Sequence, residues 1–209
     1  MSVAALEALA PLFRYPDAAF PRHVDEARRV VPALESFARE TAALDRASLE
    51  STYTSTFDLA PSCSPYLGAH LFGDDSRARA RLMLGLQQTL GTPASRRLAG
   101  RRPRRPEALG GEDAAGPAAG TAAFHELPDH IAEVLANASA FGENEWGELE
   151  ELVLRPALAK MASLLTTTNP YRLLVDAALE ELRVACCESP ERPRNSQPAT
   201  PNSPSGDAP

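Results

Sequence analysis

Residues 127–141 read LPDHIAEVLANASAF, and the larger apolar side chains in this stretch recur at intervals of three and four residues. That spacing places them on one side of an α-helix, which completes a turn in about 3.6 residues. Polar residues stand between them, so we expect one buried face and one solvated face. The stretch therefore predicts an amphipathic helix that packs against a core.

The same spacing recurs along most of the chain, and no segment alternates apolar and polar residues with a period of two. The sequence therefore predicts an all-α protein, a single-domain bundle of eight to ten helices. We expect the other helices over residues 2–14, 17–31, 32–37, 45–57, 64–71, 76–90, 144–165 and 169–182.

Several of these helices have recognisable start signals. Short polar side chains accept hydrogen bonds from the free amides of a first helical turn, so we expect N-caps at Ser2, Asp17, Ser64, Ser76 and Asn169. A further helix should start at Asp45. Pro156 falls inside a helical pattern, and it has no amide hydrogen to donate. It should therefore kink that helix or restart it.

Two shifts in composition divide the chain. Residues 92–121 contain little beyond Ala, Gly, Pro and Arg, and residues 189–209 are rich in Pro, Ser and Asn. Neither segment has enough large apolar side chains to offset the entropy of ordering it. We therefore predict one helical domain built from residues 1–91 and 122–188, with a flexible insertion between the two parts and a disordered tail.

Composition also limits the class of protein. The net charge is −7, and residues 122–188 hold 12 acidic against 4 basic side chains, which favours basic peptides over nucleic acid as partners. No apolar run approaches the roughly 20 residues that span a bilayer, and the first residues lack the basic segment of a secretory signal. Three cysteines, two of them adjacent, do not suggest a disulfide framework. We expect a cytoplasmic protein without direct membrane insertion.

Four aromatic residues, Tyr53, Phe57, Tyr66 and Phe72, fall in a stretch that also carries small polar side chains. Rings at helical spacing could line a groove for an apolar peptide helix. The simpler interpretation is that the four rings belong to the core, because buried aromatic stripes are far commoner than grooves. The residues alone favour the core, and the groove remains the alternative.

A second candidate lies at the start of the helix quoted above, where Glu126, Asp129 and His130 follow one another closely. Such a cluster could bind the basic groups of a ligand. In the simpler interpretation, Asp129 caps the helix and His130 is solvated. Spacing alone favours the simpler interpretation.

Two further classes of function have weaker support. Cys63, His70, His125 and His130 could form a metal or catalytic set, but none of them shows the paired spacing of structural zinc ligands. No nucleophile elbow, phosphate loop or dinucleotide motif is present either. The arginines between residues 96 and 105 could form a nucleic-acid arm, but no aromatic residues stand among them. We expect no catalytic residue, no metal site and no nucleic-acid partner.

The motifs occur in an order that resembles the NarJ branch of the TorD/DmsD/NarJ chaperone family. Residues 53–58 (YTSTFD), 63–74 (CSPYLGAHLFGD) and 76–79 (SRAR) look like its first signature. Residues 126–130 (ELPDH) look like its second signature, and residues 169–171 (NPY) are also similar. Ala80 departs from the pattern, which usually has glycine there, and the insertion is longer than the linker that the family leads us to expect.

This resemblance implies a non-catalytic cytoplasmic chaperone for a molybdenum oxidoreductase. Such a protein binds the N-terminal twin-arginine leader of the catalytic subunit, or its remnant, and holds the subunit while molybdenum cofactor is inserted into it. The implied client is the catalytic (alpha) subunit of respiratory nitrate reductase or a relative. No cofactor would stay on the chaperone, which would be a monomer or a homodimer. The implied peptide-binding residues are Glu126, Asp129, His130, Tyr53, Phe57, Tyr66, His70 and Phe72.

Overall fold

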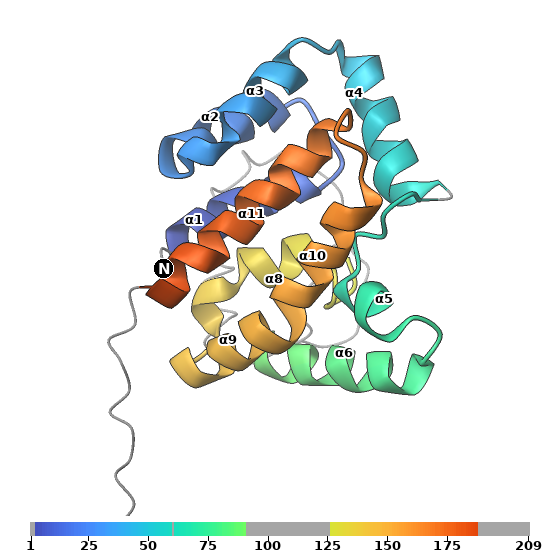
Figure 1. Ribbon diagram of the computed structural model, residues 1–209, viewed down its shortest axis with the longest axis vertical. Coiled ribbons are helices and arrows are strands. Elements are labelled where there is room, and N and C mark those ends of the chain that lie inside the picture. The colour runs from blue at the N-terminus through green and yellow to red at the C-terminus, as the bar shows by residue number, and fades with distance from the viewer. Residues whose placement is uncertain (1–2, 60, 91–125, 188–209) are drawn as a thin grey trace, which may run out of the picture.

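The computed structural model describes residues 3–59, 61–90 and 126–187, with side chains as far as Arg183. Within these ranges the chain forms nine continuous helical segments and no sheet, so the predicted all-α class and helix number are confirmed (Figure 1). The predicted insertion at 92–121 and tail at 189–209 lie outside the described residues.

The α-helices of the described ranges are named by the labels of Figure 1. In chain order they are α1 (Val3–Leu9), α2 (Phe20–Val30), α3 (Glu35–Ala42), α4 (Arg46–Tyr53), α5 (Leu67–Phe72), α6 (Ser76–Leu90), α8 (Ile131–Ala136), α9 (Glu143–Leu149), α10 (Arg155–Leu164) and α11 (Pro170–Cys187). Short 3₁₀ turns are found at Ala10–Phe13, Pro32–Leu34 and Ala138–Ala140, and π-helical turns at Thr54–Asp58 and Glu150–Leu154.

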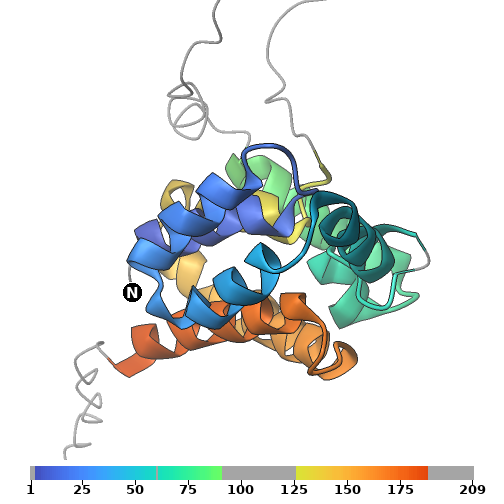
Figure 2. The same cartoon turned by 90° about the horizontal axis from the view of Figure 1, so that it is seen from above.

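The helices surround one hydrophobic core. In Figure 2, α10 and α11 lie along one side of the bundle and α1 and α2 along the other, with α3 between them. Fully buried side chains come from both parts of the chain, for example Phe13 and Phe37 from the first part and Ile131 and Leu158 from the second. The two parts therefore form a single domain. None of the helices in the described ranges combines the length and apolar character needed to cross a membrane.

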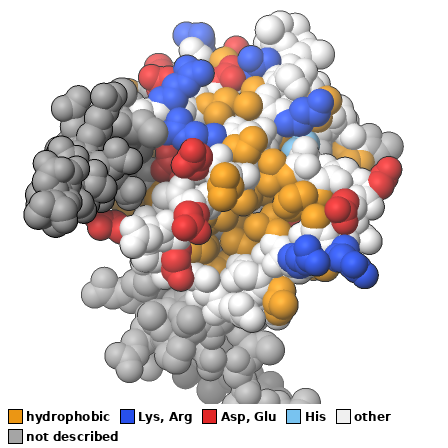
Figure 3. All heavy atoms as spheres, turned by 60° about the horizontal axis from the view of Figure 1, so that its bottom comes forward, with side chains coloured by type: hydrophobic (Ala, Val, Ile, Leu, Met, Phe, Trp, Pro, Cys, Tyr) orange, Lys and Arg blue, Asp and Glu red, His pale blue; other side chains and the backbone are white. Residues whose placement is uncertain are grey.

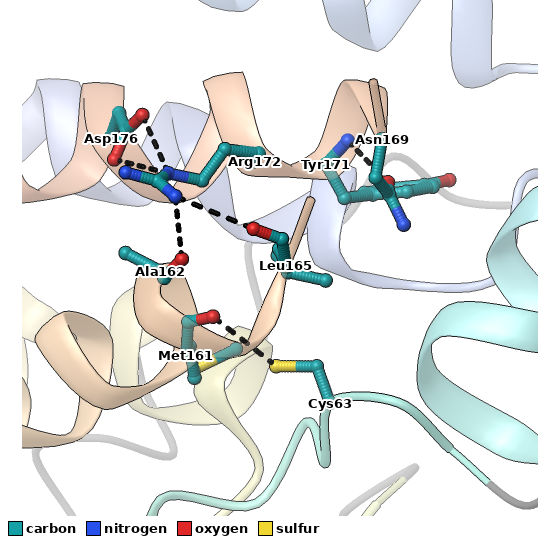
Figure 4. Close-up of polar contacts among 8 residues, drawn as sticks. All are labelled: Cys63, Met161, Ala162, Leu165, Asn169, Tyr171, Arg172 and Asp176. Atoms are coloured by element: carbon teal, nitrogen blue, oxygen red, sulfur yellow. Dashed lines mark hydrogen bonds and ion pairs between the residues drawn. The ribbon is translucent and has the colours of Figure 1, made fainter. Parts of the chain in front are cut away.

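The predicted helix start at Asp45 and the predicted N-cap Asn169 are confirmed. The Asp45 carboxylate accepts a hydrogen bond from the Ser48 amide at 2.7 Å, in front of α4. The Asn169 side-chain oxygen accepts one from the Tyr171 amide at 2.9 Å, in front of α11 (Figure 4). Each bond satisfies an amide that has no partner within its own helix.

Three other predicted caps are wrong, and Ser2 lies outside the described residues. The Asp17 carboxylate accepts from the Ala19 amide at 2.8 Å, but α2 begins only at Phe20, with Ala19 in the N-cap position. At the start of α6 the Asp75 carboxylate, one residue before Ser76, accepts from the amides of Arg77 and Ala78 at 3.1 and 3.0 Å. Ser64 does not begin a helix either, because α5 begins only at Leu67. The backbone just before Leu67 pairs instead with a distant segment, which is described below.

The helix does not break at Pro156. α9, the π-helical turn Glu150–Leu154 and α10 follow one another without a gap, and Pro156 lies in the first turn of α10. The Arg155 amide donates to the Glu150 carbonyl, five residues earlier. The irregularity predicted at Pro156 therefore takes the form of a wider turn just before it.

The helix predicted over residues 127–141 is shorter than expected. Leu127 lies outside it and is 46% exposed, and α8 ends at Ala136. Asn137 then leaves the helical conformation, and its side-chain amide donates to the Glu133 carbonyl at 2.8 Å. Asparagine competes in this way for backbone hydrogen bonds, which accounts for the early end.

The last two helices are tied together by one side chain. The Arg172 guanidinium donates to the carbonyls of Ala162 and Leu165, at 2.7 and 3.4 Å, and pairs with Asp176 at 2.8 Å (Figure 4). The end of α10 thereby gains partners for carbonyls that its own helix leaves free. This connection holds the start of α11, and with it the neighbouring Tyr171, against the core.

Candidate functional site

The two sequence signatures meet in space through a short backbone pairing. Tyr66 and His130 form an isolated antiparallel bridge. The Leu67 amide donates to the Asp129 carbonyl at 2.9 Å, and the Ile131 amide donates to the Pro65 carbonyl at 3.0 Å. The first residues of α5 and α8 are therefore fixed to each other, although they are far apart in the sequence.

Around this bridge, five side chains contact one another: Tyr66, Arg79, Glu126, Asp129 and His130. We call this set the junction. Asp129 is fully buried, and its carboxylate pairs with the Arg79 guanidinium at 3.0 Å. Arg79 also lies over the Tyr66 ring, 5.4 Å from the ring centre. Asp129 therefore acts as the buried counter-ion of Arg79. The prediction that Asp129 caps α8 is wrong.

His130 is the residue that caps α8. Its Nδ1 accepts a hydrogen bond from the Ala132 amide at 3.1 Å, and its ring packs edge-on against Tyr66 with centres 5.3 Å apart. Only 2% of His130 is exposed, and burial lowers its pKa to about 4. The neutral ring is needed for the cap, because a protonated Nδ1 cannot accept a hydrogen bond.

Glu126 is the exposed member of the junction. Its carboxylate accepts a hydrogen bond from the Tyr66 hydroxyl at 3.2 Å. Burial and the Glu126 charge both raise the pKa of Tyr66. Of the three residues predicted at the start of this helix, only Glu126 is placed to meet a basic group from solution, whereas Asp129 and His130 are enclosed.

Gly68 makes the close packing of the junction possible. A Cβ atom at this position would lie 2.8 Å from Arg79 Cγ and 2.8 Å from Asp129 Oδ2. Any larger residue would displace the ion pair or the start of α5. Neither Gly68 nor Arg79 was among the predicted site residues, although both stand inside the quoted motifs.

A second ion pair holds the other side of α8. The Arg14 guanidinium contacts the Glu133 carboxylate at 2.6 Å, and Glu133 is only 6% exposed. This pair could not be predicted from the sequence, because the two residues are remote from each other and belong to none of the motifs.

Tyr53 and Phe57 lie away from the junction, in the aromatic core. Both are buried, and both rings contact the ring of Tyr171, with centres 5.8 and 5.0 Å apart. The core interpretation is confirmed for these two residues. Tyr171 was not predicted here, although the motif at residues 169–171 contains it. Its buried hydroxyl makes no hydrogen bond within the described part of the chain.

His70 and Phe72 are on α5, near the junction but not part of it. His70 Nε2 lies 2.7 Å from the Ser64 carbonyl, and burial lowers the pKa of the half-buried ring. Phe72 is half-buried at the last position of the helix, and Gly73 then turns the chain with a φ of 52°. That left-handed conformation suits glycine, so the position of Phe72 depends on it.

Apolar side chains are exposed on the face that α5, α6 and the π-helical turn before α10 form, at the bottom of Figure 1 and toward the viewer in Figure 3. Leu152 and Leu84 are 66% and 55% exposed. Leu71 and Phe72 on α5 and Met83 on α6 are half-buried, and α5 contacts both α6 and the π-helical turn that carries Leu152. We call these five residues the apolar face. Exposed apolar patches of this kind are typical of surfaces that bind a partner.

A separate groove of about 840 Å³ lies between α2, α3 and the start of α4. Phe20, Val24 and Leu49 contribute to its apolar lining. Arg28 on its rim pairs with Asp25 and Glu35. None of the predicted site residues lines this groove, so the motifs and the groove belong to different parts of the molecule.

The predicted metal alternative gains no support from the described residues. Within them, no three His, Cys, Asp or Glu side chains are grouped so that they could hold a metal ion. Burial raises the pKa of the Cys63 thiol to about 12, and a protonated thiol is a poor ligand. His125 and the arginines between 96 and 105 lie outside the described residues.

The chain matches no protein-family model, and no curated protein matches it either. The resemblance to the NarJ branch therefore rests on the motifs quoted above.

Proposed function

We propose that the protein is a cytoplasmic maturation chaperone for a molybdenum oxidoreductase. Its ligand would be the N-terminal leader of the catalytic subunit, or the remnant of that leader, bound as an amphipathic helix. The proposed client is the catalytic subunit of respiratory nitrate reductase or of a close relative. The observation that carries the proposal is the apolar face, which lies on the helices that the two motif regions hold in place.

The apolar face would supply most of the affinity. A helix that lays one apolar stripe over Leu152, Leu84 and the half-buried residues beside them removes those side chains from water. Burial of apolar area yields about 25 cal/mol per Å² before the costs of association are subtracted. The acidic groups nearby would mainly speed the encounter and select basic leaders.

The junction would act indirectly. Asp129 and His130 are enclosed and already have partners, so in this proposal they position α5 and α8 and make no contact with the ligand. Glu126 remains the junction residue that could meet a basic side chain of the leader. The molybdenum cofactor enters the client, and the chaperone carries no catalytic group of its own.

Calorimetry with synthetic N-terminal peptides of the molybdenum oxidoreductases from the same organism tests the proposal. Leu152→Ser should weaken the binding of the client peptide by about tenfold, because central apolar contacts dominate such interfaces. Leu59→Ser is the matched control, since Leu59 is 71% exposed and lies near Tyr15 and Ala47, away from the apolar face. Absence of saturable binding by every peptide would refute the function, and equal losses in the two variants would refute the surface.

A further inference from the structure

The two ends of the apolar face differ in charge. Four exposed carboxylates lie on or just after α9, at one end: Glu143, Glu145, Glu148 and Glu151. The first turns of α6, at the other end, carry the exposed Arg77 and Arg81 together with Asp74 and Asp75. The first end thus has a net charge of −4 and the second has none, counted on these exposed groups.

Glu148, Arg77 and Arg81 are on the same sides of their helices as the exposed leucines. Glu148 precedes Leu152 by four residues, which is about one helical turn. Arg77 and Arg81 precede Leu84 by seven and three residues, so the three share one stripe of α6. A ligand lying on the leucines would therefore come within reach of both charged ends.

The charged groups are also available to a ligand. No ion pair engages Glu143, Glu148 or Glu151 within the described ranges, and the same holds there for Arg77 and Arg81. Figure 1 places α9 toward one end of this face and the first turn of α6 toward the other. Figure 3 shows several acidic side chains at the left margin of the apolar patch and both basic and acidic side chains at its right margin.

We infer that the surface binds a helical peptide in one direction, with the N-terminal end of the peptide over α9 and its C-terminal end over the first turns of α6. This inference rests on the proposed function. A helix carries partial positive charge at its N-terminus and partial negative charge at its C-terminus. A leader with basic residues near its start adds to the same polarity. The reversed orientation would place the negative end of the helix on four carboxylates.

The surface also sets the length of the bound segment. α6 has 15 residues and is about 22 Å long. A docked helix that reaches from α9 to the first turn of α6 therefore needs about four turns. Shorter peptides would contact one end only, and their direction would be less strictly selected.

Crosslinking measures the direction. A photoreactive phenylalanine analogue is placed at the first or the last helical position of the client peptide, and the crosslinked residues of the full-length chaperone are mapped by mass spectrometry. The first position should crosslink mainly to residues 143–152, and the last position mainly to residues 76–84. In the double variant Glu143→Gln with Glu148→Gln, each of the two peptide positions should crosslink to residues 143–152 and to residues 76–84 in about equal amounts. Glu40→Gln with Asp58→Asn, which removes two exposed carboxylates elsewhere, should leave them unchanged.

The outcomes separate the two proposals. If the parent protein binds the peptide saturably but the crosslinks are reversed or equally distributed between the two ends, the inferred direction is wrong. The chaperone proposal is not affected by that result. Crosslinks concentrated in the groove between α2 and α3 overturn the surface as well as the direction. Absence of saturable binding overturns the proposed function, and the inference about direction with it.

Discussion

The junction and the apolar face are neighbours with opposite physical character. The junction pairs its charges internally, with Asp129 fully buried against Arg79. The apolar face leaves Leu152 and Leu84 more than half exposed. All five junction residues stand inside the quoted motifs, whereas Met83, Leu84 and Leu152 of the apolar face stand outside them. The motif residues of the junction therefore hold the fold together, and the proposed binding surface includes residues that no motif marks.

Loss of Asp129 should produce the largest effect. Asp129→Ala leaves Arg79 without its counter-ion, and breaking a buried pair from one side costs about 3–5 kcal/mol. The Arg79 side chain is 31% exposed, so we expect the lower part of that range. Urea unfolding measures the change. Asp25→Ala is the control, because its ion pair with Arg28 is exposed, and it should cost less than about 1 kcal/mol. A fully stable Asp129→Ala protein that no longer binds peptide would instead make Asp129 a ligand contact.

The enclosed histidine should make stability depend on pH. Burial lowers the pKa of His130 from 6.5 to about 4, so the unfolded chain takes up a proton first as the pH falls. The contribution of His130 to the free energy of unfolding should therefore decrease between about pH 6.5 and pH 4 and level off below, by on the order of 3 kcal/mol in all.

The matched variant is His130→Asn, whose amide oxygen can still accept from the Ala132 amide but does not titrate. Its unfolding free energy should fall less steeply over the same pH range, with the half-buried His70 supplying part of the remaining slope. Identical slopes in the two proteins would mean that His130 is not the group responsible.

A methyl group at Gly68 should disturb the junction by a smaller amount. The added Cβ of Gly68→Ala would meet Arg79 Cγ and Asp129 Oδ2, each at 2.8 Å. Overpacking of this kind costs about 1–3 kcal/mol. Gly147→Ala on α9 is the control, because its Cβ would meet nothing within 4 Å, and it should raise stability by up to about 1 kcal/mol. Thermal unfolding of both variants would reveal opposite shifts, and shifts of the same sign would contradict the packing argument.

The smallest effect on stability should come from the apolar face. Leu152 is 66% exposed, so Leu152→Ser should change the free energy of unfolding by no more than about 0.5 kcal/mol. The same protein sample should lose peptide affinity if the proposed function holds. A large loss of stability would show that Leu152 belongs to the fold in the same way as the junction does.

Much of the fold could be predicted from interactions between residues that are close together in the sequence. The helix start at Asp45 and the cap at Asn169 depend on atoms within a few residues of one another, and both were predicted. Ser64 failed as a cap because its neighbours pair with residues near position 130. The core interpretation of the four aromatic residues holds for Tyr53 and Phe57, whereas Tyr66 and Phe72 are half-buried.

The sequence by itself determined the class of the fold and the side of each helix on which apolar residues gather, because those properties follow from the helical period and from contacts between near neighbours. Only the tertiary structure decided that Arg79 and Asp129 pair across 50 positions and that Gly68 must leave room for them. It also decided which apolar stripes are covered and which remain open at Leu84 and Leu152. The helical period determines which residues lie on the same side of a helix. Whether that side is buried depends on another helix, which comes from a distant part of the chain.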